Sequence, residues 1–326
     1  MRRLSKAGFK ADFLHQAILP DWWEDSYRDD PSILPDVEIR VSRFLEIPLS
    51  RIRDPSVSLN PPVYVNAKLR RVKEIDRDRL APAIHAALKI GGAVVRSLQS
   101  TVQHPDPPPA NALQWRDTIR RAGNSVALAD ILGDLWQRGI PVVPVDLMPS
   151  PSFQGLASIV DGRPIVLLGH KHDEPGRVAF FIAHEVGHIV AGDCALNEPV
   201  VDEDEEILDE SAIEQRADQY ATTIMVGAES IPDVQASNWR DLAESAANIE
   251  LASGVDASAV IFAWARRTGD YGKARLAVEA IYCAHGARRA LREHLLRNLD
   301  LDNATESDRN LIRCVIGEPE RDAIAS

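Results

Sequence analysis

Three residues in one short apolar stretch have the types and the spacing of a metal site. His184, Glu185 and His188 form the pattern H-E-x-x-H within residues 178–193, a mostly apolar run without proline. Such a run predicts a helix, and histidines four positions apart on a helix project from the same face. Their imidazole nitrogens can therefore reach one zinc ion, and the glutamate can contact a water on that ion. Bare polar groups would be costly in so apolar a segment, which favours this interpretation over two histidines buried in a core.

A second segment supplies a carboxylate that would complete the site. Residues 210–225 carry apolar side chains at helical spacing, which predicts another helix. Catalytic zinc takes three protein ligands and keeps one position open, and we interpret Glu214 as the third ligand. Asp218, four residues further along the same face, could accept the other ring N–H of a zinc-bound histidine and fix its tautomer. The alternative is a solvated helix with two surface acids.

The two motifs together resemble the ImmA/IrrE family of zinc metallopeptidases, whose fold is a minimal gluzincin. The resemblance rests on HEVGH, on E-x-x-A-D-x-Y-A beginning at Glu214, and on the apolar segments 139–143 and 164–168 that precede them. It covers about residues 110–270. Two features depart from the family pattern: Asp218 stands where members commonly carry Asn, and the second helix ends in Ile-Met-Val-Gly rather than in a Leu-Met-Pro-like segment. Neither departure touches a proposed ligand.

The resemblance implies a cytoplasmic, zinc-dependent endopeptidase that holds one Zn2+ per chain on His184, His188 and Glu214. Glu185 would take the proton of the attacking water and pass it to the leaving amine. The substrate class implied is a transcriptional repressor or another small regulatory protein. Its cleavage would induce a stress, phage or mobile-element programme.

Two questions stay open at the level of sequence. Tyr220 and His172 are the candidates for a donor to the transition state, and a solvent-exposed loop is the alternative for His172. A second hypothesis for the whole chain is a protein-binding regulator, or the antitoxin-like partner of a toxin, that uses the zincin fold as a binding module. The flanking helical regions fit that role, whereas Glu185 favours the enzyme because a binder would not need a general base.

Composition limits the function classes. The 326 residues are 45% hydrophobic and 26% charged, as in an ordinary globular protein. The net charge of −12 disfavours sequence-independent binding of nucleic acid by the chain as a whole, and direct nucleic-acid binding would need a local basic face. There is no apolar run of eighteen residues, so no membrane span is expected, and the start of the chain lacks the apolar segment of a signal peptide. Three scattered cysteines suit a reducing cytoplasm better than a disulfide framework.

The segment pattern predicts an α+β fold that is mostly helical, with a small zincin-like sheet packed on the HEVGH helix. Its expected parts are a helical N-terminal domain for partner recognition, or a degenerate helix-turn-helix, at 1–100, a proline-rich linker at 101–110, the zinc metallopeptidase core at 111–230, and a helical C-terminal region at 231–326. Outside the two motif segments, the pattern predicts helices at 7–18, 35–47, 76–100, 239–253, 257–268 and 272–299, a strand at 63–65, a helix cap at Ser125 and a solvated acidic loop at 202–210.

Three strands are expected within the core. They span residues 140–145, 155–160 and 164–168, and Asp161-Gly162 predicts a hairpin turn between the last two. The last strand leads directly into the HEVGH helix. We expect it to form the wall of the cleft and to pair with an extended substrate by strand addition.

Overall fold

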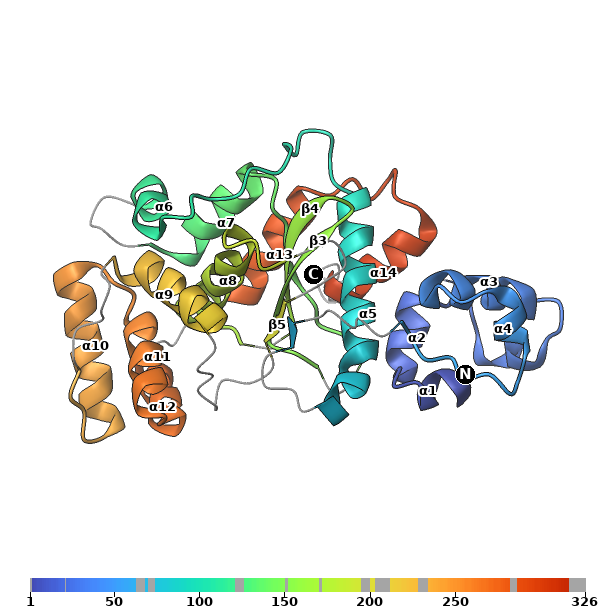
Figure 1. The fold of residues 1–326 in the computed structure, drawn as a ribbon, viewed down its shortest axis with the longest axis horizontal. Coiled ribbons are helices and arrows are strands. Elements are labelled where there is room, and N and C mark those ends of the chain that lie inside the picture. The colour runs from blue at the N-terminus through green and yellow to red at the C-terminus, as the bar shows by residue number, and fades with distance from the viewer. Residues whose placement is uncertain are drawn as a thin grey trace, which may run out of the picture.

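Figure 1 shows the protein as a computed structural model. The structure describes residues 2–20, 22–62, 68–69, 74–120, 126–149, 152–169, 172–194, 200–202, 212–227, 234–281 and 286–316. This part of the chain holds fourteen α-helices and one mixed five-stranded sheet, which confirms a mostly helical α+β fold. Within the same residues, no helix is long and apolar enough to cross a membrane.

The sheet is small and mixed. Its strands, in spatial order, are β1 Lys68–Leu69, β5 Val200–Asp202, β3 Gly155–Val160, β4 Arg163–Leu168 and β2 Val142–Pro144. β3 and β4 form an antiparallel hairpin, while β2 runs parallel to β4 and β5 runs antiparallel to β3. Asp161 and Gly162 join the hairpin with φ of 49° and 78°, the positive pair that a two-residue turn of this kind requires. The predicted hairpin is therefore confirmed.

The expected pairing of β4 with a substrate strand is wrong. β4 is hydrogen-bonded to β3 along one edge and to β2 along the other, so neither edge is open to a substrate strand. The position of the strand was predicted correctly. Its pairing with β2, which precedes the hairpin in the sequence, could not be predicted from local patterns. Other expectations lie outside the described residues: a strand at 63–65, a helix cap at Ser125 and, apart from Asp202, the acidic run at 202–210.

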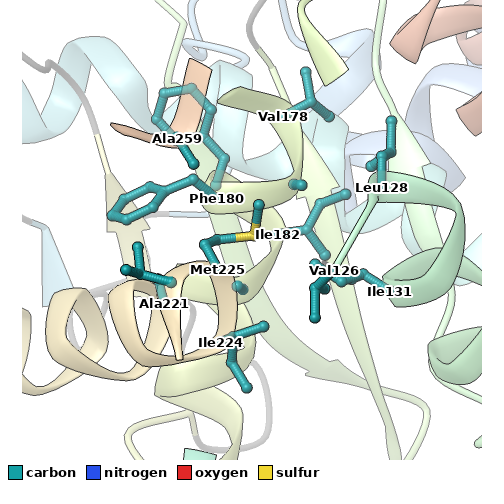
Figure 2. Close-up of a cluster of buried hydrophobic side chains, with 14 of the residues drawn as sticks. Val126, Leu128, Ile131, Val178, Phe180, Ile182, Ala221, Ile224, Met225 and Ala259 are labelled. Carbon is teal, nitrogen blue, oxygen red and sulfur yellow. The ribbon is translucent and has the colours of Figure 1, made fainter. Parts of the chain in front are cut away.

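The sheet separates two hydrophobic cores because successive side chains of a strand point to opposite faces. On β4, Val166 and Leu168 belong to one core, and Ile165 and Leu167 to the other. Helices α7, α8, α9 and α11 meet in the first core (Figure 2). These helices span Leu128–Gln137, Pro175–Val190, Ala212–Val226 and Ala257–Thr268.

The second core lies under α5, which spans Glu74–Arg96 on the opposite side of the sheet from α8 and α9 (Figure 1). The helix expected at 76–100 is thus present, with slightly earlier bounds. Its Gly91 lies over the sheet, where a Cβ would be 3.4 Å from Ile165 Cδ1. This small residue lets the helix approach the strands closely.

The first helices form a unit that packs beyond α5. They are α1 Arg2–Lys6, α2 Ala11–Ala17, α3 Leu34–Leu45 and α4 Leu49–Arg53, with a 3-10 turn at Asp25–Asp29. A single helix was expected at 7–18, but Gly8 has a φ of 94° and α2 begins only after it. The predicted helix at 35–47 corresponds to α3.

The N-terminal unit is tied to the end of the chain. Helix α14, Glu306–Ile316, packs on α2 and α5. Asn310 Nδ2 donates to the Leu19 carbonyl at 3.0 Å, and the Arg40 guanidinium lies 3.0 Å from the Glu306 carboxylate. Residues from both ends of the sequence therefore share one hydrophobic core.

The remaining helices lie on the α8 side of the sheet or at its end (Figure 1). They are α6 Ala112–Ile119, α10 Trp239–Ser253, α12 Tyr271–Ile281 and α13 Ala287–Arg297. The helices expected at 239–253 and 257–268 are confirmed as α10 and α11, each capped by a side chain, Asn238 and Asp256 respectively. The long helix expected at 272–299 is instead two helices, α12 and α13, and α14 was not predicted.

Candidate metal centre

Helix α8 carries the first motif and is buried along most of its length. It begins at Pro175, where the fixed φ and missing N–H of proline are tolerated, and ends at Val190, just before Gly192 with a φ of 71°. α8 packs against α7, α9, α11, β3 and β4, which explains why it is apolar nearly all round. The helix predicted at 178–193 is therefore confirmed.

Helix α9 brings Glu214 to the two histidines because it crosses α8 at close range. At the crossing, a Cβ on Gly187 would lie only 3.0 Å from the Ala217 Cα. Two small residues thus allow the two backbones to approach, and side chains one turn away on each helix can meet. His184, His188 and Glu214 are all buried here.

The three side chains converge with distances that suit one small ion. His184 Nε2 lies 3.2 Å from His188 Nε2 and 3.3 Å from Glu214 Oε2, and His188 Nε2 lies 3.5 Å from Glu214 Oε1. Tetrahedral zinc with ligands at about 2.0–2.1 Å has ligand atoms about 3.3 Å apart. This buried group could therefore hold a metal ion, and its two imidazoles and one carboxylate suit zinc.

Each histidine turns its other ring nitrogen toward a carboxylate. His184 Nδ1 lies 2.7 Å from Asp218 Oδ1, and His188 Nδ1 lies 3.2 Å from Asp193 Oδ2. An acceptor at Nδ1 keeps the proton there and leaves Nε2 as the nitrogen for a metal. Asp218 is thus where the sequence pattern predicted it.

Asp193 was missed by sequence reasoning. It is the last residue of the run predicted to be a helix, but it lies in the turn after α8, and its second oxygen is 3.2 Å from the Arg216 guanidinium of α9. The signal was an acid following the helix stop at Gly192, five positions after His188. Such a residue is easily read as an ordinary polar turn residue.

The charge of Glu214 suits a ligand. Burial alone would raise the pKa of this carboxyl group. Hydrogen bonds with His184 and His188 outweigh burial, so the pKa of Glu214 lies well below its ordinary value. The group is therefore a carboxylate at neutral pH, the form in which it binds cations.

Glu185, next to the first histidine, is also buried. Its carboxyl group lies against Gly155, the first residue of β3, and α8 packs on this strand. The Glu185 side chain therefore lies at the contact between α8 and the first residue of β3.

The two candidate donors lie in different places. The Tyr220 hydroxyl donates to the Pro109 carbonyl at 2.8 Å, and its ring stacks on Trp115 at 5.9 Å between centroids. Burial raises the pKa of Tyr220 far above its ordinary value. This hydroxyl holds the proline-rich segment against α9 and does not join the three ligands.

His172 lies beside α8 at Phe181, which is about one helical turn before His184. Its ring stacks on Phe181 with 5.9 Å between centroids and 14° between planes. Burial lowers the pKa of His172 to about 4, so its imidazole is neutral at pH 7. Its role as a donor stays a prediction.

Searches against protein families, curated proteins and solved structures found nothing that matches this chain. The likeness to ImmA/IrrE proteins therefore rests on the quoted motifs alone.

Proposed function

We propose that this protein is a zinc-dependent endopeptidase of the ImmA/IrrE type with a zincin-like core. The observation that carries the proposal is the convergence of His184, His188 and Glu214 beside the buried Glu185. The two Nε2 atoms are 3.2 Å apart, and each lies 3.3–3.5 Å from one oxygen of Glu214. A purely structural zinc site usually has four protein ligands and needs no general base. Three ligands beside a glutamate instead leave one coordination position for water or substrate.

The chain's own residues have separate tasks in this reaction. When bound, zinc supplies a Lewis acid for the scissile carbonyl and lowers the pKa of a water toward neutrality. Glu185 accepts the proton of that water and delivers it to the leaving amine. Asp218 and Asp193 keep the histidines in the tautomer that presents Nε2.

The proposed substrate is a transcriptional repressor or another small regulatory protein, cut at few sites. The N-terminal unit supports recognition at a distance from the cleavage site, since α5 and the sheet lie between it and α8 (Figure 1). Trp22, Leu34 and Ile39 expose apolar surface on this unit, with Trp22 half-exposed. That surface suits a protein partner.

The deciding experiment is a cleavage assay on the protein encoded by the neighbouring gene, run with the wild type and with Glu185→Gln. The substitution keeps the size of the side chain but removes the base. We expect the wild type to cleave the partner and the variant to retain zinc without cleaving. If both proteins bind the partner and neither cleaves it, the binding-module hypothesis is the better one.

A further inference from the structure

Gly155 leaves no room for a side chain next to Glu185. A Cβ at residue 155 would lie 2.9 Å from Glu185 Cδ and 3.2 Å from Cγ, and closer still to Oε1. Contacts under 3.0 Å are essentially never made by real Cβ atoms. The carboxyl group of Glu185 therefore fills the space that any side chain at residue 155 would occupy.

The backbone does not demand glycine at this position. Gly162, in the neighbouring turn, has a φ of 78°, whereas Gly155 is not among the residues with positive φ. An L-residue could adopt the backbone conformation of residue 155. What excludes a side chain is the neighbour, not the local chain geometry.

The strand is paired on both sides, whereas the carboxylate is the far end of a side chain. Gly155 pairs with Leu168 of β4 on one side and with Asp202 of β5 on the other. Glu185 instead ends in rotatable bonds, although it is only 2% exposed. A side chain added at residue 155 would therefore displace the carboxylate before it displaced the strand.

We infer that Gly155 is a positioning residue for the general base. Because it lacks a side chain, the start of β3 forms a wall that sets where the Glu185 carboxylate stands relative to His184 and His188. This inference rests on the proposed function, since Glu185 is a base only if the protein is a hydrolase.

The test is Gly155→Ala in the full chain, with zinc content, steady-state kinetics and a crystal structure as readouts. We expect one zinc per chain, a KM near that of the wild type and a kcat about 100-fold lower, because a misplacement of about 1 Å is enough for such a loss. The crystal structure should show the Glu185 carboxylate moved away from Gly155. The matched control is Gly133→Ala on α7, where a Cβ would meet nothing within 4 Å. It should leave kcat unchanged.

A double variant tests the inference if Gly155→Ala does not fold. If Gly155→Ala alone does not fold, Gly155→Ala with Glu185→Ala should, because the second change frees the space that the first one needs. An unfolded double variant would overturn the inference, as would a Gly155→Ala protein with wild-type kcat or an unmoved Glu185. Absence of cleavage by the wild type would instead contradict the proposed function, and the crystal structure would still decide where the carboxylate stands.

Discussion

The Asp193 carboxylate lies 3.2 Å from His188 Nδ1, although the two residues belong to different elements, a turn and the helix before it. The other oxygen of Asp193 lies 3.2 Å from Arg216 on α9. One carboxylate thus links the helix that carries the histidines to the helix that carries Glu214.

Asp193→Ala should weaken zinc binding by about 10- to 100-fold, because His188 loses the acceptor that fixes its tautomer. Asp193→Asn should be milder, since an amide oxygen still accepts the N–H bond. Arg216→Ala should have a smaller effect, because the Arg216 side chain is 58% exposed and its ion pair is screened by water. Competition with a chromophoric chelator measures all three affinities. Equal zinc affinities in wild type and Asp193→Ala would show that Asp193 does not support His188 as a ligand.

Asp218→Ala should also lower zinc affinity or activity by about 10- to 100-fold without unfolding the protein. The residue lies 2.7 Å from His184 Nδ1, so its removal affects the other histidine. Asn at this position should restore most of the affinity. Circular dichroism verifies the fold, and unchanged zinc binding in Asp218→Ala would mark it as a surface acid.

His184→Ala or Glu214→Ala should abolish tight zinc binding, because each removes one of three ligand atoms within 4.8 Å of one another. Glu185→Gln serves as the control and should retain one zinc per chain. Elemental analysis after gel filtration gives the stoichiometry. A wild type that takes up no transition metal, even after zinc is added, would contradict the metal site itself.

Burial of His85 should make the protein less stable at acidic pH. It is fully buried on α5, and its Nε2 lies 2.6 Å from the Phe44 carbonyl. Burial lowers the pKa of His85 from 6.5 to about 4. Above pH 6.5 both folded and unfolded states are neutral here. Between pH 6.5 and about 4 only the unfolded state binds the proton, so the free energy of unfolding falls as pH falls.

Between pH 7 and pH 5, titration of His85 should lower the free energy of unfolding by about 2 kcal/mol. Urea unfolding of wild type and His85→Gln at both pH values measures it, and the difference between the proteins matters because His172 titrates in the same direction. Glutamine can still donate to the Phe44 carbonyl. If the two proteins lose equal stability, His85 does not cause the acid sensitivity.

A fragment that begins at Asn111 should aggregate. It lacks α5, so Ile165 and Leu167 on the sheet would lose the helix that covers them, and large exposed apolar patches promote association. Light scattering during refolding tests this. Partner recognition is therefore better examined with Trp22→Ala in the full chain, whose zinc content should not change. A soluble, monomeric fragment with bound zinc would show that residues from 111 onward fold alone.

The sequence predicted the parts of this site that depend on local spacing. The HEVGH helix, the Asp161-Gly162 turn and the helix with Glu214 follow from periodicity and turn chemistry within short windows. Gly155 beside Glu185 could not be predicted, because that contact joins a strand and a helix thirty residues apart. The same holds for α14, whose apolar face is explained by packing on α5 and on α2, which are both distant in the sequence.

The two-sided sheet has a consequence for how relatives of this protein would diverge. Neighbouring residues of β4 should experience different selective pressures, since Ile165 and Leu167 belong to the core under α5, and Val166 and Leu168 belong to the core with α8 and α9. A lineage that adapts to a new partner can remodel the first pair together with α5 while the second pair stays fixed. Substitutions at residues 165 and 167 should therefore covary with residues of α5, and substitutions at residues 166 and 168 with residues of α8 and α9.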